Sequence, residues 1–173
     1  KKNAVILSST AQPGEVVIAA YDIDGSPHPQ FQLSFDSTSF KESSVLAEQL
    51  GAMRELGESG LVRAGKDISN PGLLGTLAML METSRVGAVV DVDAIVVPEG
   101  LTLVSWLQMY PGMGFVVTTR PENQEKVLEV FTRRGLTARV IGRVTEERKL
   151  IIRSGKEESV LFDLARECVT GIH

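Results

Sequence analysis

The sequence predicts an α+β fold in one domain, on three observations. The chain has 173 residues, the length of one ordinary domain, and 43% of them are apolar, which is enough to build a continuous core. Short β-branched runs typical of strands alternate with longer segments in which apolar residues recur at helical spacing. Between residues 115 and 142 this alternation predicts a strand–helix–strand unit.

The first third of the chain predicts two strands and a helix. Residues 15–21 are rich in β-branched side chains and follow Pro13-Gly14, so they should form a buried strand. Residues 28–35 alternate, which predicts a half-buried strand that forms a hairpin with the first. Its inward face should carry Phe31, Leu33 and Phe35. Ser43-Ser44 should cap a helix of about four turns. The inward face of this helix should carry Leu46, Leu50, Met53 and Leu56.

The middle of the chain carries a strong signal for a helix start. Asn70 should be the N-cap and Pro71 the first helical residue, because proline's missing N–H is not needed there. The apolar residues that follow at helical spacing are Leu73, Leu74, Leu77, Leu80 and Met81. Gly87 should end this helix and lead into a strand at residues 88–90.

The remaining elements follow the same signals. A helix is expected at residues 101–109, and Trp106, Met109 and Tyr110 should belong to the core or an interface. The other expected strands are residues 115–119, 136–142 and 149–153, and the other expected helices lie between Pro121 and Gly135 and at residues 157–168.

Composition excludes several functions. With 18 basic and 22 acidic residues, the net charge of -4 gives no broad basic surface for nucleic acid or an anionic membrane. No apolar run approaches the roughly 20 residues that span a bilayer. The single cysteine, Cys168, cannot form an internal disulfide and has no Cys or His neighbours of the kind a metal site needs. We therefore expect a cytoplasmic protein without a resident metal in this chain.

Residues 60–67 nearly match a phosphate-binding P-loop. Gly60 is followed after four residues by Gly65 and Lys66. Asp67 stands where a serine or threonine should offer its hydroxyl to magnesium, and the segment follows a predicted helix rather than a strand. The match is therefore interpreted as accidental.

Residues 67–75 are the leading candidate for a binding site. Small and polar residues at a helix start leave N–H groups unpaired, and these attract a phosphate or carboxylate together with the positive end of the helix dipole. Asp67 could add a carboxylate for magnesium or for a substrate donor. The alternative is an ordinary capped helix start, in which Gly72 and Gly75 allow close packing.

Other polar segments are less specific. Residues 36–39, which include Asp36 and Thr38, offer a carboxylate and three hydroxyls at a strand end, and they fit a ligand site or a loop before a helix equally well. Residues 22–25 begin like a calcium loop but lack its later ligands, so a turn is expected. The two histidines, His28 and His173, give little support to a catalytic triad.

Several short runs occur in a characteristic order along the chain. They are residues 65–75, 82–84, 86–88, Ile95, Pro98, residues 112–117 and residues 140–144. This order resembles the C-terminal domain of the aminoimidazole ribonucleotide (AIR) synthetase superfamily. Within it, residues 67–72 and 106–112 are similar to the archaeal group called methanogenesis marker protein 2.

The resemblance implies an α/β/α layered domain with a mixed sheet. It also implies that residues 1–14 link this domain to an N-terminal ATP-binding domain outside this chain, in a protein that forms a homodimer. In relatives that half carries the aspartates that bind Mg²⁺ and ATP, so both cofactors are expected in the full-length protein, and this fragment is expected to be inactive alone.

The resemblance also nominates site residues and a function. Those expected to face the phosphates or the acceptor substrate are Asp67, Ser69, Asn70, Gly72 and Gly75. The implied function is that of an ATP-dependent phosphotransferase or ligase acting on a small molecule, with a link to methanogenesis. The alternatives are a non-catalytic binding or dimerisation module and a nucleotide sensor without turnover. The synthetase's Gly-x-His-Ser-Asn-Gly run is replaced here by Pro27-His28-Pro29 and Asp36-Ser37-Thr38, so purine synthesis is not implied.

Overall fold

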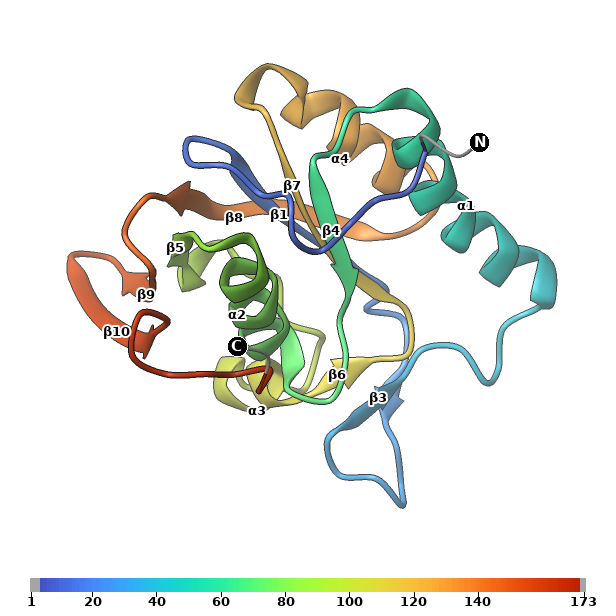
Figure 1. Ribbon diagram of the computed structural model, residues 1–173. Helices are drawn as coiled ribbons and strands as arrows, with labels where there is room; N and C mark the ends of the chain where they lie inside the picture. Colours follow the sequence, from blue (N-terminus) through green and yellow to red (C-terminus); the bar gives the residue numbers. More distant parts are fainter. Residues whose placement is uncertain (1–3, 172–173) are drawn as a thin grey trace.

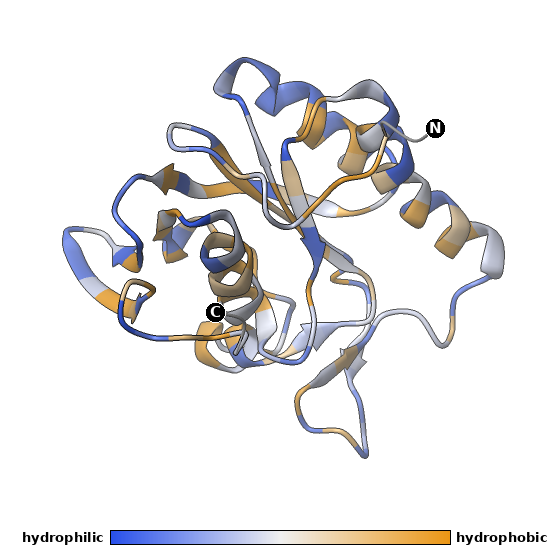
Figure 2. Cartoon of the chain, in the orientation of Figure 1, coloured by the Kyte–Doolittle hydropathy of each residue, from blue (hydrophilic) through white to orange (hydrophobic). Residues whose placement is uncertain are grey.

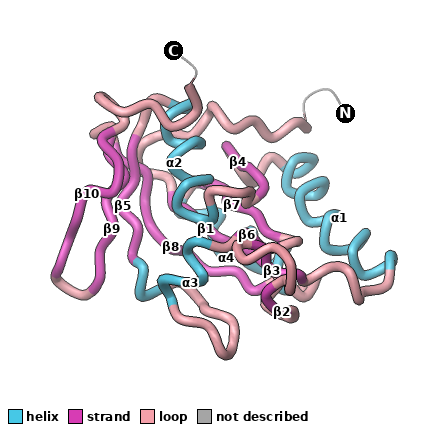
Figure 3. Tube along the Cα trace, turned by 90° about the horizontal axis from the view of Figure 1, so that it is seen from below, coloured by secondary structure: helices cyan, strands magenta, loops and turns pink. Residues whose placement is uncertain are grey.

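A seven-stranded sheet forms the centre of the computed structural model, which describes residues 4–171. The strands lie in the order β10-β9-β5-β8-β1-β7-β4, as the tube in Figure 3 shows from below. They are β1 (Val16–Tyr21), β4 (Ala64–Asp67), β5 (Gly87–Asp91), β7 (Gly114–Thr119), β8 (Thr137–Thr145), β9 (Lys149–Ser154) and β10 (Glu157–Asp163). Strands β5 and β9 run parallel and the other neighbours antiparallel, which confirms the predicted mixed sheet.

Helices cover both faces of this sheet (Figure 1). They are α1 (Ser43–Ser59), α2 (Gly72–Ser84), α3 (Leu103–Gln108) and α4 (Gln124–Thr132), with short 3-10 turns η1 (Val92–Ala94) and η2 (Pro121–Asn123). Buried residues of α1 and α4 share one hydrophobic cluster, and those of α2 and α3 share the other. The α/β/α layering expected from the resemblance is therefore confirmed.

Strand β1 lies at the middle of both cores. Successive side chains of a strand point to opposite faces of its sheet, and both faces of β1 are covered. Val16, Ile18 and Ala20 accordingly join the cluster under α1 and α4. Val17, Ala19 and Tyr21 join the cluster under α2 and α3. This explains why the predicted strand is a continuous apolar run, and Figure 2 shows the apolar residues gathered in the central strands and α2.

A second, smaller sheet stands beside the main one. It consists of β2 (Ser26–Pro27), β3 (Ser34–Asp36) and β6 (Tyr110–Pro111). Strand β3 pairs antiparallel with β2 and parallel with β6. The loop between β2 and β3 extends away from the body of the molecule (Figure 1).

The hairpin predicted from residues 28–35 is wrong. Only residues 34–36 form a strand here, and Phe31 and Leu33 are 60% and 51% exposed. Strand β1 cannot pair with this segment, because β7 and β8 already occupy its two edges.

The prediction of α1 needs a smaller correction. The helix begins at Ser43 after Glu42, without a side-chain cap bond, so Ser43-Ser44 are helical residues rather than the cap. Its buried residues are Gln49, Ala52 and Leu56, whereas Leu50 is 55% exposed. Leu46 and Met53 pack against the same cluster, so the predicted face is confirmed except for Leu50, and the polar residue Gln49 is buried as well.

Both predicted ends of α2 are displaced. Pro71 occupies the N-cap position that was predicted for Asn70, and the helix ends at Arg85, whose φ of 58° is left-handed, rather than at Gly87. Gly87 begins β5, where a Cβ atom would lie 2.0 Å from the carbonyl oxygen of Glu147. This glycine is needed for the close approach of two chain segments, not for ending the helix.

The end of the chain also differs from its prediction. Residues 157–163 form β10, antiparallel to β9, instead of a helix. Gly155, with a φ of 55°, reverses the chain directly after β9, and the returning segment continues the sheet. The predicted strand–helix–strand unit β7–α4–β8 is confirmed, with β1 lying between its two parallel strands.

The segment before β1 packs along the domain. Leu7 forms a bridge with Ala64, and the N–H of Gly65 donates to the carbonyl oxygen of Leu7 at 3.1 Å. The hydroxyl of Thr83 in α2 donates to the carbonyl oxygen of Ser8. Residues 1–3 of the predicted linker 1–14 lie outside the described residues.

Candidate phosphate and substrate site

Three chain segments that are distant in sequence meet where β1 and β4 end and β7 begins. Strands β1 and β4 both run antiparallel to β7, so their carboxyl ends lie at the same edge, where α/β sheets commonly bind ligands. Asp22 follows β1 and Asp67 ends β4. The N–H of Asp22 donates to Met113, and the N–H of Ile68 donates to Gly114, both at 2.9 Å.

The loop between β4 and α2 depends on Gly72. Its φ is 70°, a left-handed conformation that favours glycine, and its N–H donates to the carbonyl oxygen of Ser69 at 2.8 Å. A Cβ atom on Gly72 would lie 2.3 Å from the carbonyl oxygen of Leu107. The loop therefore approaches the end of α3 more closely than any other residue would allow.

Two further contacts hold this loop on α2. The N–H of Ser69 donates to the hydroxyl of Thr76, which is fully buried, at 3.1 Å. A Cβ atom on Gly75 would lie 2.4 Å from Cβ of Pro71, so this glycine makes room for the proline. Gly75 is therefore needed for packing against Pro71, whereas Ser69 and Gly72 determine the conformation of the loop.

Asp67 and Asn70 are the exposed polar side chains of the loop. The carboxylate of Asp67 is 70% exposed, and its Oδ1 lies 3.6 Å from Nζ of Lys66. Asn70 is also exposed. The first turn of α2 follows directly after these side chains. First-turn N–H groups have no partners within their own helix, and that of Gly72 donates to Ser69.

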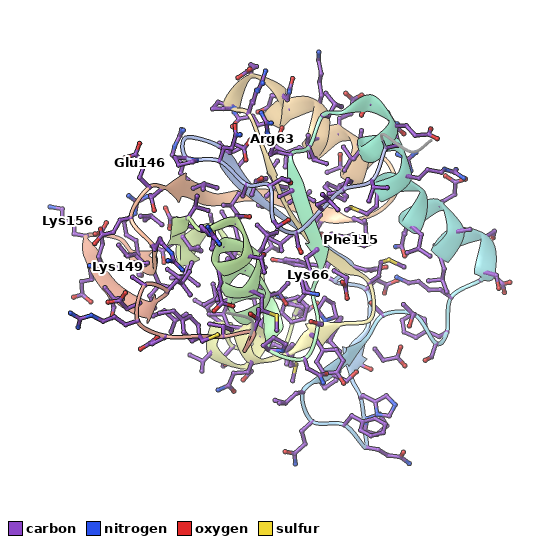
Figure 4. The ribbon with its side chains drawn as sticks, viewed as in Figure 1. Arg63, Lys66, Phe115, Glu146, Lys149 and Lys156 are labelled. Carbon is purple, nitrogen blue, oxygen red and sulfur yellow. The ribbon has the colours of Figure 1, made fainter. Side chains whose placement is uncertain are left out.

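The P-loop interpretation has no structural basis. Gly65 and Lys66 belong to strand β4, where they pair with Val117 and Val116 of β7. Figure 4 shows Lys66 on this strand close to Phe115. A strand with its N–H groups in a ladder cannot wrap around a phosphate.

An open groove of about 530 Å³ lies along the loop. It is lined by Asp67, Ile68, Ser69, Asn70, Pro71, Met79, Tyr110, Pro111 and Gly112. Its volume falls in the range typical of small-molecule sites.

The small sheet brings the second predicted segment to this groove. The N–H of Gly112 donates to the carbonyl oxygen of Phe35 at 2.9 Å, which sets residues 36–38 beside Gly112. A Cβ atom on Gly112 would lie 3.0 Å from Oγ1 of Thr38. Thr38 therefore lies next to the groove lining, at a place where the absence of a side chain on Gly112 allows the contact.

Asp36 is used by its own turn. Its Oδ1 accepts hydrogen bonds from the N–H groups of Ser39 at 2.9 Å and Thr38 at 3.1 Å. These donors hold the pKa of the Asp36 carboxyl below its usual value. Asp36 thus shapes residues 36–39, and the hydroxyl of Thr38 is the better candidate for a ligand contact.

A buried polar cluster beside the site was missed by sequence reasoning. The carboxylate of Asp22 is 2% exposed and accepts hydrogen bonds from Nζ of Lys41 and Nε2 of Gln49. Nζ of Lys41 also lies 3.3 Å from Asp24. No local pattern could have predicted this cluster, because its members are 19 and 27 residues apart and come from a strand end, a loop and a helix.

Two buried polar atoms, one of them in this cluster, lack a partner. Oγ of Ser37 and Oε1 of Gln49 are buried without a hydrogen-bond partner among the described residues. Buried polar atoms of this kind are uncommon, and they lower stability unless a ligand or water provides the missing bond.

Other predicted features belong to the framework. Trp106 is buried, and its ring contacts Tyr21 and Phe35 edge-on at 5.1 Å, which confirms its assignment to the core. Across residues 4–171, no three His, Cys, Asp or Glu side chains are close enough to hold a metal ion together. In the same residues, no helix is both long and apolar enough to cross a bilayer.

Comparison with known proteins finds relatives by sequence and by structure. Two uncharacterized proteins are similar over 99% of this chain and 53% of their own length, one from Methanocaldococcus jannaschii (39% identity) and one from Synechocystis sp. (33%). The chain thus spans about half the length of these relatives. The structure of Thermotoga maritima PurL complexed with ATP superposes with a TM-score of 0.75 at 20% identity, over 94% of this chain and 27% of PurL.

The family model described as "AIR synthase related protein, C-terminal domain" matches residues 12–155. The matched range includes the candidate groove and every strand of the two sheets except β10. The chain belongs to the family of AIR synthase related proteins, whose C-terminal domain it contains.

Proposed function

We propose that this chain forms the substrate and phosphate side of an ATP-dependent phosphotransferase or ligase that acts on a small molecule. The observation that carries this proposal is the loop of residues 67–72, which sets an exposed carboxylate, Asp67, beside the start of α2. Thr38 and Gly112 close the same edge of the sheet. Such an arrangement can hold a phosphoryl group by backbone N–H groups, which do not require a positively charged side chain.

ATP and Mg²⁺ belong to the proposal for the whole protein. The similar PurL structure holds ATP, which supports the use of this nucleotide in a relative of the same fold. Magnesium in phosphate sites usually binds one or two carboxylates together with the phosphates. Asp67 fits the role of one such carboxylate, and the other half of the protein would provide the remaining ligands.

Several finer points stay predictions. Residues 1–14 would act as the link to the other half, which would mediate homodimer formation in a cytoplasmic protein. The acceptor substrate is a small molecule of unassigned identity. A link to methanogenesis also stays a prediction, because similar proteins occur in both M. jannaschii and Synechocystis sp..

The test is a titration of the ¹⁵N-labelled chain with inorganic phosphate and, separately, with Mg-ATP. Saturable shifts of the amide signals of residues 67–75 are expected. They should weaken in Asp67→Asn for Mg-ATP, and they should persist in Glu58→Gln, a matched change on the exposed surface of α1. The same titration on the full-length protein gives the affinity of the complete site.

The competing function is a binding or dimerisation module of the same fold without catalysis. It predicts no saturable shift of residues 67–75 with either ligand, in this chain or in the full-length protein. That outcome would refute the proposed phosphate site.

A further inference from the structure

A second cavity lies at the opposite end of strands β4 and β7. Residues 61–63 precede β4 and Arg120 follows β7, so this cavity is at the far end of the strands that carry the groove. Its volume is about 380 Å³. Thr10, Arg63, Arg120 and Asn123 provide polar lining, and Val5 and Leu7 provide apolar lining. Figure 4 shows Arg63 at the upper end of β4, well away from Lys66.

Arg63 is oriented by a buried carboxylate. Glu15 is 4% exposed, and its Oε1 accepts a hydrogen bond from Nε of Arg63 at 3.1 Å. Its Oε2 accepts bonds from the N–H of Gln12 at 3.0 Å and the hydroxyl of Thr118 at 2.8 Å. Because Glu15 engages Nε, it fixes the guanidinium plane. Among residues 4–171 the two terminal nitrogens bond to no acceptor, so they remain for a ligand.

The backbone at Arg63 is also held in place. Its N–H donates to the carbonyl oxygen of Thr118 at 2.8 Å, and its carbonyl oxygen accepts from the hydroxyl of Thr10 at 2.7 Å. A binding side chain supported in this way loses little conformational freedom when a ligand arrives. The side chain is 33% exposed and therefore reachable from the cavity.

Arg120 has no such partner. It is exposed, and within the described part of the chain its guanidinium makes no ion pair or hydrogen bond. Two arginines thus line a cavity in which one carboxylate, Glu15, offsets only one positive charge. The local excess of positive charge favours an anion, and guanidinium groups match phosphate oxygens in geometry.

The cavity also has an apolar part. Val5 and Leu7 are 68% and 51% exposed, and both belong to its lining. We propose that this cavity is a binding site for a small phosphorylated metabolite with an apolar body. Arg63 and Arg120 bind the phosphoryl group, and the body covers Val5 and Leu7. This site is separate from the groove at residues 67–72 and does not depend on the proposed function.

Inorganic phosphate and phenyl phosphate are the two probes for this site. In the ¹⁵N-labelled chain, both should shift the amide signals of residues 60–63 and 120–123 in a saturable way. Phenyl phosphate should bind more tightly, because its ring can cover the exposed valine and leucine. The signals of residues 67–75 report on the groove in the same spectra, so success or failure at the two sites is read separately.

Arg120→Gln is the decisive variant. It should weaken binding of both probes by about tenfold or more, since each loses charge-assisted hydrogen bonds. Arg120 touches no buried carboxylate, so the variant should fold normally. Arg54→Gln, an exposed change on α1, is the matched control and should leave both affinities unchanged.

Two results would overturn the proposal. One is the absence of saturable shifts at residues 60–63 and 120–123 with millimolar phenyl phosphate. The other is an affinity at these residues that Arg120→Gln leaves unchanged, because the anion would then be held elsewhere.

Discussion

The two ends of β1 carry buried carboxylates in different surroundings. Glu15 precedes the strand, and both of its oxygens are occupied by Arg63, Thr118 and Gln12. Asp22 follows the strand and binds Lys41 and Gln49, but Oε1 of Gln49 has no partner among the described residues. At the Glu15 end, the carboxylate is fully bonded and orients Arg63. At the Asp22 end, Oε1 of Gln49 can still accept a hydrogen bond.

The groove at residues 67–72 and the cavity at Arg63 and Arg120 are built in different ways. At the groove, the arrangement depends on the backbone, because glycines at positions 72 and 112 allow close approach of neighbouring segments. At the arginine cavity, it depends on side chains, because a buried glutamate fixes a guanidinium. Variants at the two ends of β1 test whether this distinction is correct.

The largest effect is expected for Asp22→Ala. Lys41, with a side chain 11% exposed, would be left as a charge without its buried partner, which costs about 4 kcal/mol. Urea denaturation measures the loss. Asp24→Ala is the matched control: its side chain is 80% exposed, so the loss should stay below about 1 kcal/mol. Equal losses in the two variants would show that the buried contact is not the stabilising one.

Gly72→Ala should have the next largest effect. The added Cβ atom would combine an unfavourable left-handed φ with a contact 2.3 Å from the carbonyl oxygen of Leu107. We expect a loss of about 3 kcal/mol in the free energy of unfolding and weaker phosphate shifts at residues 67–75. Gly100→Ala separates the two causes, because Gly100 has a φ of 82° and nothing within 4 Å of the new atom. Its loss should be about 1 kcal/mol; a loss as large as that of Gly72→Ala would exclude the steric cause.

Glu15→Ala should destabilise less than Asp22→Ala. Water can solvate the partly exposed Arg63, and the main cost comes from the buried hydroxyl of Thr118 losing its acceptor, about 2 kcal/mol. Thermal unfolding against Glu58→Ala measures the difference. If Glu15→Ala proves the more damaging of the two β1 variants, the contrast between the ends of the strand is wrong.

The smallest effect concerns pH and Asp36. Its folded pKa is held below the unfolded value by the N–H groups of Ser39 and Thr38. The resulting stability is fully present above the unfolded pKa, about 3.9, and is lost as pH falls through the lowered folded pKa. Asp36→Asn keeps the turn but removes the titration. The difference in unfolding temperature between wild type and Asp36→Asn should therefore shrink in acid, and a difference independent of pH would contradict this account.

Much of the fold could be predicted from the sequence because the signals are local. The runs that form β1, β5, β7 and β9 are β-branched and bounded by turn residues, and the helices between them have apolar residues at helical spacing. The errors arose where local signals compete. Residues 28–35 alternate like a strand, yet both edges of β1 are taken and only residues 34–36 pair, in the small sheet. Residues 157–163 form a strand because Gly155 returns them alongside β9.

The candidate site was predicted in part. Residues 67–72 were nominated as a loop before a helix, and Thr38 was nominated as a hydroxyl at a strand end. Their meeting across Gly112 could not be predicted, because it requires the parallel pairing of β3 with β6. Gly75 was nominated with the loop, and the structure gives it a packing contact with Pro71.

The sequence by itself determined the family, the α+β class, the strands β1, β5, β7, β8 and β9, and the segment that forms the principal loop. These properties depend on residue type and spacing along the chain, which the sequence records directly. Only the tertiary structure decided that Asp22 binds Lys41 and Gln49, and that Glu15 orients Arg63 toward a second cavity. A charged group's partner depends on which strands and helices become neighbours, and the order of the sheet, not the order of the chain, sets those neighbours.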